Sequence, residues 1–277
     1  MKIGVSSYSF SNYMSTTGCS YFDICDKAKE IGFDGIEFID LNSDDPIALA
    51  KELRAHCDKI GLEITAYTVG ANFLAEDIEA EIKRVCDCVD VCEALGAKLM
   101  RHDVCYSLPK QHLYSWRDAM KEMAPHIRKV TEYAKSKGIK TCTENHGYIF
   151  QDPSRVEALI LEVANENYGW LCDMGNFMCA DADPVKAVTI AAPYAFHVHA
   201  KDFLYKSGGE CPEHFFPTAG RNWLRGTVLG HGVVPVDQCI RILKDSGYDG
   251  WLSLEFEGME DCIPAIVVGY NYLRKHS

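Results

Sequence analysis

The chain has 277 residues, of which 47% are hydrophobic and 25% are charged, an ordinary mixture for a globular protein. Its formal net charge of −12 argues against a nucleic-acid partner, because such partners require a basic face. No apolar run is long enough to cross a membrane, and the first residues lack the features of a signal peptide. We therefore expect a cytoplasmic protein without a membrane partner.

Short β-prone runs alternate with amphipathic segments along the first half of the chain. Glycines follow three of these segments at positions that favour the end of a helix, and Pro46 stands where one helix begins. The predicted strands cover residues 3–6, 34–39, 62–67 and 98–103. The predicted helices cover residues 21–31, 46–60, 77–95 and 116–136.

The second half continues the same alternation. Its β-prone runs are residues 141–146, 168–173, 196–202 and 251–257. Helices are predicted to begin at Pro153 and Pro184, and two more cover residues 236–246 and 263–274. Strands that alternate with helices form a parallel sheet, and eight such units close into a barrel. The sequence thus predicts one domain, a (β/α)8 TIM barrel over residues 1–277.

One connection is much longer than the others and covers residues 201–234, with six glycines. It leaves the carboxyl end of the seventh strand, on the face where barrel enzymes carry their active sites. A loop of this length in a compact domain is usually functional. The thirteen cysteines contain no C-x-x-C pair, and we interpret them as buried, reduced thiols used as small apolar residues.

Four consecutive predicted strands, the fifth to the eighth, end in side chains that can bind a metal. These are Glu144, Asp173, His199 and Glu255. Each carboxylate taken alone is more often a surface or capping group, and Asp173 would suit a turn cap before Gly175. Because four ligand types coincide at four strand ends, we predict that they bind one divalent metal. An oxygen-rich set suits Mn²⁺, Mg²⁺, Co²⁺ or Fe²⁺, and Zn²⁺ remains an alternative.

Strand alternation separates the neighbouring candidates. His197 points to the same face as His199 but one pleat deeper, which favours a hydrogen-bonded interior residue over a ligand. Glu257 shares its side of the strand with Glu255, so only depth distinguishes the two.

Four motifs resemble those of the xylose-isomerase-like barrels: residues 144–147 (ENHG), 173–176 (DMGN), 197–202 (HVHAKD) and 254–257 (LEFE). Within that family the chain is most similar to the sugar phosphate isomerase/epimerase group, with D-tagatose 3-epimerase and inosose dehydratase as relatives. The resemblance implies that Glu144, Asp173, His199 and Glu255 bind the metal, commonly Mn²⁺. It also implies that Glu144 and Glu255 act as the acid/base pair.

The chemistry implied is the isomerisation or epimerisation of a small sugar or cyclitol. Proton removal beside a carbonyl forms an enediolate that a metal stabilises, and two carboxylates can exchange protons with its two faces. A lyase of the inosose dehydratase or 3-oxo-glycoside-cleaving type would use the same enolate. An endonuclease for DNA repair shares the barrel but conflicts with the charge of −12. A catalytically silent sugar-binding protein is a further alternative.

Eight further residues are candidates for substrate contacts. Asn176 replaces a residue that is often His in ketose epimerases, and the long loop carries its own Trp223 and Arg225, so substrate identity stays open. For the loop residues the alternative is a solvated surface, and for the strand-end residues it is a structural hydrogen bond. The candidates are Glu37, His102, His146, Asn176, His197, Lys201, Arg225 and His231. The oligomeric state, including a homo-oligomer, is also open.

Overall fold

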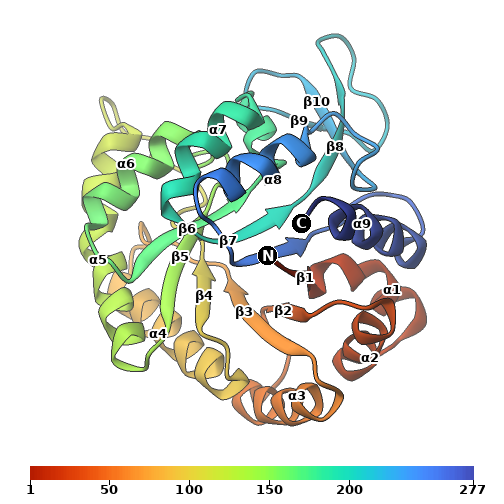
Figure 1. Ribbon diagram of the computed structural model, residues 1–277. Coiled ribbons are helices and arrows are strands. Elements are labelled where there is room, and N and C mark those ends of the chain that lie inside the picture. The colour runs from red at the N-terminus through yellow and green to blue at the C-terminus, as the bar shows by residue number, and fades with distance from the viewer.

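The computed structural model describes all 277 residues and contains a closed barrel of eight parallel strands surrounded by helices (Figure 1). The strands pair in the order β1-β11-β7-β6-β5-β4-β3-β2, so the last barrel strand closes on the first. This confirms the predicted (β/α)8 fold. The barrel strands are β1 (Lys2–Ser6), β2 (Gly35–Ile39), β3 (Glu63–Val69), β4 (Leu99–His102), β5 (Lys140–Glu144), β6 (Tyr168–Asp173), β7 (Ala195–Ala200) and β11 (Trp251–Leu254).

The outer helices begin and end close to the predicted residues. Proline is the first residue of three of them, and left-handed glycines at positions 32, 61 and 96 end three, one of which also begins with a proline. The helices are α2 (Tyr21–Ile31), α3 (Pro46–Ile60), α4 (Ile78–Leu95), α5 (Trp116–Ser136), α6 (Pro153–Val163), α7 (Pro184–Ala191), α8 (Val236–Asp245) and α9 (Cys262–His276). A short extra helix, α1 (Ser11–Thr17), was not predicted, because it buries none of its residues and has no amphipathic pattern.

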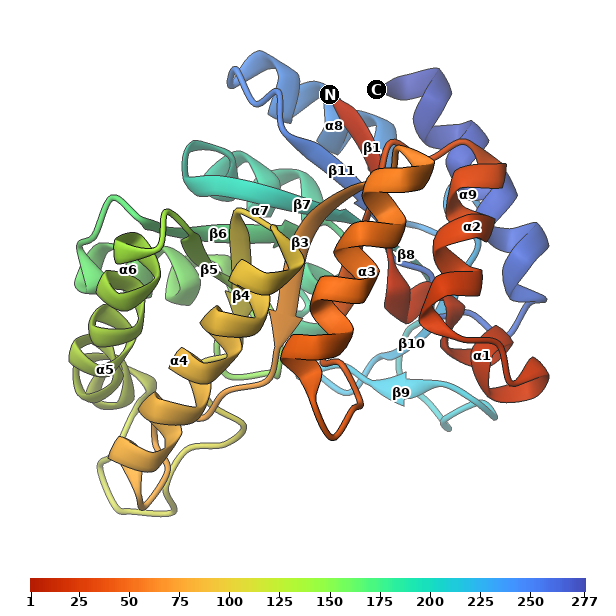
Figure 2. The same cartoon turned by 90° about the horizontal axis from the view of Figure 1, so that it is seen from below.

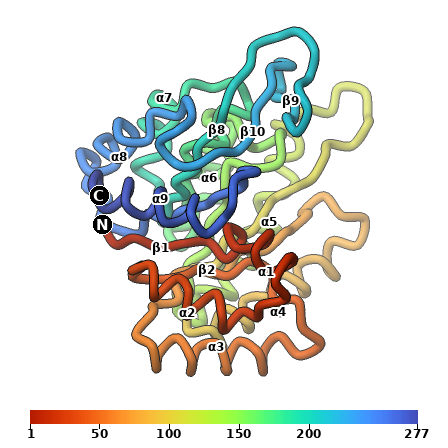
Figure 3. Tube along the Cα trace, turned by 90° about the vertical axis from the view of Figure 1, so that its right-hand side faces the viewer, coloured from red at the N-terminus to blue at the C-terminus, as the bar shows by residue number.

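The long connection expected over residues 201–234 carries secondary structure of its own, which the sequence did not predict. It folds into a separate antiparallel sheet of β8 (Asp202–Lys206), β10 (Trp223–Thr227) and β9 (Phe216–Pro217). Figure 2 shows this sheet beside the end of the barrel toward which the strands point. Both chain termini lie at the opposite end (Figures 2 and 3).

Two sets of hydrogen bonds fix the small sheet in place. The buried Asp202 carboxylate accepts hydrogen bonds from the backbone N–H groups of Gly230, Gly232 and Val234. On the other side the Tyr148 hydroxyl donates to the Pro217 carbonyl. The first set joins the beginning of the connection to its end, and the second joins the sheet to the segment that follows β5.

The apolar core has two parts. Sixty-nine buried residues form one cluster, mostly where the helices pack against the strands, and a small cluster of Ala66, Leu99, Cys142 and Leu171 fills the inside of the barrel. All thirteen cysteines are free, and most of them are buried. Among the helices, none combines the length and the apolar character that crossing a membrane requires.

Candidate metal centre

Four side chains at the carboxyl ends of β5, β6, β7 and β11 converge at the mouth of the barrel. Donor atoms of Glu144, Asp173, His199 and Glu255 all lie within 4.8 Å of one another. His199 Nδ1 is 3.5 Å from a Glu255 oxygen and 3.8 Å from one oxygen each of Glu144 and Asp173. The structure thus brings the four predicted ligands together.

The sheet register explains this convergence. Asp173 pairs directly with His199 across β6 and β7, so their side chains emerge at the same height. Asn145 fastens β5 to β6, because its side chain donates to the Asp173 carbonyl and accepts from the Asp173 N–H. Asp173 is also the turn cap that the sequence suggested: its Oδ1 accepts from the N–H groups of Gly175 and Asn176. The other oxygen, Oδ2, is left to face the cluster.

The donor set fits a divalent cation. Asp173 Oδ2 and His199 Nδ1 are buried and form no hydrogen bond, and Oδ2 has only the Lys201 ammonium 3.4 Å away, which is costly unless something binds them. Burial raises the pKa of Asp173 to about 7; the Lys201 charge opposes this, and the charges of Glu144 and Glu255 add to it. The spacing between donors also agrees, since ligands about 2.1 Å from a common ion lie roughly 3–3.5 Å apart. A cation here would neutralise an excess of buried negative charge.

Lys201 is the buried cation of the site. Its Nζ lies 2.6 Å from Glu255, 3.2 Å from Glu257 and 3.4 Å from Asp173. Burial alone would lower the pKa of Lys201, but these carboxylates hold it well above its ordinary value. Lys201 therefore keeps its charge and fixes one oxygen of Glu255. Glu257, the alternative ligand on the same side of the strand, lies one pleat further out than Glu255 and is more exposed.

A second cation supports Glu144 from the other side and was not identified from the sequence. Arg101, at the end of β4, is buried and forms ion pairs with Glu144 Oε2 at 2.9 Å and with Asp103 at 2.7 Å. Asp103 in turn contacts His146 Nδ1 at 3.0 Å. The available signal was strand alternation: Arg101 follows the inward-facing Leu99 by two residues, so it also points into the barrel.

Two of the predicted substrate-contact residues reach the cluster from its rim. Asn176 donates from its side-chain amide to Glu144 Oε1 at 2.8 Å. His146 is half exposed, so one ring nitrogen faces Asp103 while the ring itself remains open to solvent. Burial opposes protonation of His146, but the hydrogen bond to Asp103 and the charges of Glu144 and Asp103 together raise the pKa of the imidazole.

Two other candidates lie beneath the cluster and not beside it. Glu37 and His197 are completely buried, with His197 Nε2 2.6 Å from one oxygen of Glu37. The second oxygen of Glu37 lies 2.6 Å from His199 Nε2. As the sequence suggested, His197 is a hydrogen-bonded interior residue one pleat below His199.

The structure does not bring the remaining three candidates to the cluster. His102 is fully buried on the outer face of β4, where its ring packs against Phe73 and Tyr168. Arg225 lies on β10, with its guanidinium over the Phe215 ring. His231 is exposed on the connection that wraps around the Asp202 carboxylate.

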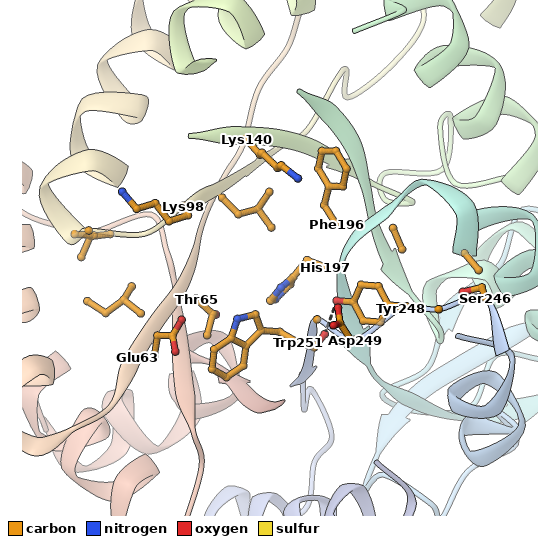
Figure 4. A pocket seen from close by; sticks show the side chains of 18 of the residues that line it. Glu63, Thr65, Lys98, Lys140, Phe196, His197, Ser246, Tyr248, Asp249 and Trp251 are labelled. Atoms are coloured by element: carbon orange, nitrogen blue, oxygen red, sulfur yellow. Dashed lines mark hydrogen bonds between the residues drawn. The ribbon is translucent and has the colours of Figure 1, made fainter. Parts of the chain in front are cut away.

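A large cavity lies at the opposite, amino-terminal mouth of the barrel. Its volume is about 860 Å³, and its walls include Phe196, Tyr248 and Trp251, with His197 at its inner end (Figure 4). The convergent carboxylates lie at the other mouth. Size alone therefore does not identify the chemical site in this barrel.

A parallel eight-stranded barrel with histidine and carboxylate donors at four neighbouring strand ends defines a (β/α)8 protein with a candidate cation site at its carboxyl-terminal mouth. The family described as "Xylose isomerase-like TIM barrel" matches residues 25–276, and the chain belongs to this family. The resemblance inferred from the four motifs is thus confirmed.

Curated relatives are more distant. The rhizopine catabolism protein MocC of Rhizobium meliloti is 26% identical over 223 residues, which cover 74% of this chain and 66% of MocC. An inosose dehydratase of Clostridium perfringens is 26% identical over 145 residues, or 50% of this chain and 47% of the relative. The chain thus spans less than two thirds of the length of each.

Solved structures share the fold across the whole chain. A probable 3-DHS dehydratase, AsbF of Bacillus anthracis, has a TM-score of 0.79 at 21% identity and covers 100% of both chains. D-psicose 3-epimerase of Clostridium cellulolyticum H10 has a TM-score of 0.75 at 18% identity, covering 100% of this chain and 99% of its own. The IOLI protein, solved with a bound zinc atom, has a TM-score of 0.75 at 17% identity, with 99% and 97% coverage.

Proposed function

We propose that this protein is a divalent-metal-dependent isomerase or epimerase of a small sugar or cyclitol. The observation that carries the proposal is the convergence of Glu144, Asp173, His199 and Glu255 around one point. The family membership and the epimerases among the structural neighbours support it. Mn²⁺ is the cation we propose, because three of the four donors are carboxylates.

A cation held by these four residues would place positive charge beside a substrate carbonyl and its neighbouring hydroxyl, which favours the enediolate. The side chains of the protein then manage the protons. Glu144 and Glu255 belong to β5 and β11, which are separated in the barrel by β6 and β7. We infer that they face the two sides of a planar enediolate, so one removes a proton and the other returns one.

The partners of these two carboxylates suit that role. Arg101 and Asn176 hold different oxygens of Glu144, and Lys201 holds one oxygen of Glu255. Each carboxylate is thereby oriented by groups that remain in place during a reaction. Positioned acid/base groups contribute roughly 10²–10⁴-fold to rate. His146 and Asn176 at the rim are the proposed contacts to substrate hydroxyls.

A lyase on the same scaffold is the second candidate, and a specific observation favours it. The His146–Asp103 pair adds a partly exposed acid/base group beside Glu144, and Lys201 adds a buried ammonium. Elimination needs such an acid to protonate a departing hydroxyl after the enolate forms. The names of the inosose dehydratase relatives and of AsbF agree with this alternative.

The small β8–β10–β9 sheet is the proposed lid of the site. It spans the mouth from Tyr148 to Glu260, which accepts a hydrogen bond from Thr227 on β10. Lids exclude water from reactive enolates. A structure with a bound sugar should therefore show Trp223 or Arg225 close to the ligand, and a ligand far from both would contradict the lid.

The test is proton exchange in deuterated water. The protein loaded with Mn²⁺ is incubated with a panel of ketoses and inososes, and NMR follows the carbon beside the carbonyl. An isomerase or epimerase should place solvent deuterium there in an isomeric product, whereas a lyase should release a dehydrated product or an aglycone.

The controls are chelator-treated protein and the double variant Glu144→Gln/Glu255→Gln, both of which should lose the exchange. The two-carboxylate mechanism would be excluded if the product carried no solvent deuterium and the double variant turned over as fast as wild type. A hydride shift between neighbouring carbons would then be the better account. Absence of turnover with the whole panel, despite bound metal, would favour a silent sugar-binding protein.

A further inference from the structure

The centre of the barrel holds a chain of three fully buried polar side chains that runs away from the metal site. His199 contributes Nδ1 to the ligand cluster, and its Nε2 lies 2.6 Å from one oxygen of Glu37. The other oxygen of Glu37 lies 2.6 Å from His197 Nε2. Contacts this short between nitrogen and oxygen are sustained by an N–H donor. Glu37 thus places one carboxylate oxygen 2.6 Å from a nitrogen of each imidazole.

We propose that Glu37 is the positioning residue of the metal centre, which fixes His199 as the Nε2–H tautomer so that Nδ1 is free to bind the cation. An imidazole has one lone pair in its neutral form, and the partner of the other nitrogen decides which atom carries it. An ionised carboxylate only accepts, so it places the hydrogen on Nε2 and the lone pair on Nδ1. The inference rests on the proposed metal-dependent function.

His197 has a matching role in this arrangement. Its ring lines the amino-terminal cavity (Figure 4), and its Nε2 contacts Glu37. Each carboxylate oxygen of Glu37 faces an imidazole nitrogen, and all three side chains lie in an interior without contact with water. The sequence pattern places Glu37 among the candidates for the substrate pocket because strand alternation does not reveal this depth.

The experiment compares metal affinity in four proteins: wild type, Glu37→Gln, His199→Gln and the double variant. Zn²⁺ affinity is measured by competition with a chromophoric chelator. Because the amide places an NH2 donor where one carboxylate oxygen stood, the glutamine side chain in Glu37→Gln cannot accept at both positions. We expect Glu37→Gln to weaken Zn²⁺ binding by roughly 10–100-fold, the usual effect of losing a group that orients a ligand.

The double variant separates positioning from simple charge. If Glu37 acts through His199, adding Glu37→Gln to His199→Gln should change affinity by no more than about twofold, because the coupled residue is already gone. An equal loss in both backgrounds would mean that Glu37 only attracts the cation at a distance, and would overturn the proposal. Glu63→Gln is the matched control: it removes a carboxylate that is exposed and paired with Lys2, and should leave affinity unchanged.

A measurement on the wild-type protein covers the case in which Glu37→Gln does not fold. In Zn²⁺-loaded protein labelled with ¹⁵N-histidine, His199 should show a protonated Nε2 and a metal-bound Nδ1. A metal-bound Nε2 would overturn the positioning role while leaving the proposed function intact. Failure of wild-type protein to bind any divalent cation would instead overturn the proposed function, and this inference with it.

Discussion

Where β3 to β6 line it, the inside of the barrel has two layers with opposite character, whereas Glu37 on β2 and His197 on β7 keep the lower level polar on the other side. The lower layer is the apolar cluster of Ala66, Leu99, Cys142 and Leu171. Two residues further along three of those strands, the side chains are Arg101, Glu144 and Asp173. A shift of one pleat thus converts a packed core into a cluster of buried charges.

This difference separates stability from function along each strand. Apolar side chains in the lower layer gain free energy by burial, whereas the charged layer above it loses hydration and leaves polar atoms unpartnered. Such a layer is retained where a ligand compensates for it. The comparison therefore predicts that substitutions in the lower layer reduce stability, and those in the upper layer reduce binding and turnover.

The largest expected effect on folding comes from Leu171→Ala, compared with Asp173→Asn two residues later. Leu171 is fully buried, so its truncation should lower the free energy of unfolding by about 2–5 kcal/mol. Asp173→Asn removes a buried carboxylate beside Glu144 and Glu255, and should leave the metal-free protein as stable or more stable. Urea unfolding of both metal-free variants measures this. A strong destabilisation by Asp173→Asn would contradict the claim that the upper layer does not stabilise the fold.

The next effect concerns turnover. Glu144→Gln and Glu255→Gln each keep the shape and one oxygen ligand but remove the proton acceptor, so each should lower kcat by at least ~10²-fold. Some metal should remain bound. Steady-state kinetics on the substrate found in the labelling screen, with metal content measured in parallel, provides the readout. If both variants stay active with full metal content, these carboxylates are ligands only.

Much of this arrangement could be predicted from the sequence, and the reasons are local. Strand alternation and the helix-ending glycines predicted the eight units, and the four ligands stand at strand ends that the hydrophobic pattern makes visible. The depth of each side chain within the barrel, and the pairing of strands far apart in the sequence, could not be predicted. Glu37, His102 and His146 look equivalent in sequence, yet they lie beneath, outside and at the rim of the site. The β8–β10–β9 sheet was missed because its strands are short and pair only with one another.

A smaller effect is expected at the anchor of the lid. In wild type, Oδ2 of Asp202 accepts from the backbone N–H groups of Gly230 and Gly232, and Oδ1 accepts from that of Val234. Asp202→Asn keeps only one acceptor oxygen. The N–H groups at the other position therefore lose their partner. An unsatisfied buried donor costs about 1–3 kcal/mol. Hydrogen exchange at these amides should accelerate while exchange in the barrel strands is unchanged. Uniform acceleration across the barrel would show that Asp202 supports the whole fold and not the lid.

The smallest expected effect per pH unit is a pH dependence of the folding stability, which arises from a residue outside the site. Burial lowers the pKa of His102 to about 4, from a value near 6.5 in the unfolded chain. Above pH 6.5 the imidazole is neutral in both states. Between pH 6.5 and 4 only the unfolded chain gains the proton, so stability falls as the pH falls, by at most about 1.4 kcal/mol per pH unit.

The variant His102→Phe tests this assignment, because its aromatic ring can keep the packing against Phe73 and Tyr168 but cannot bind a proton. The free energy of unfolding, measured from pH 7 to pH 4.5, should fall less steeply in the variant than in wild type. Parallel slopes for the two proteins would show that other groups cause the acid sensitivity.

The most direct test of the account is the metal content of the protein after loading with Mn²⁺ and removal of free ion. Elemental analysis should find one divalent cation per wild-type chain, and a sharply reduced amount in Asp173→Ala and His199→Ala, whose circular dichroism should remain that of a folded barrel. Leu171→Ala, from the layer below, should retain the cation wherever it remains folded. Full occupancy in Asp173→Ala or His199→Ala would contradict the assignment of the four strand-end ligands.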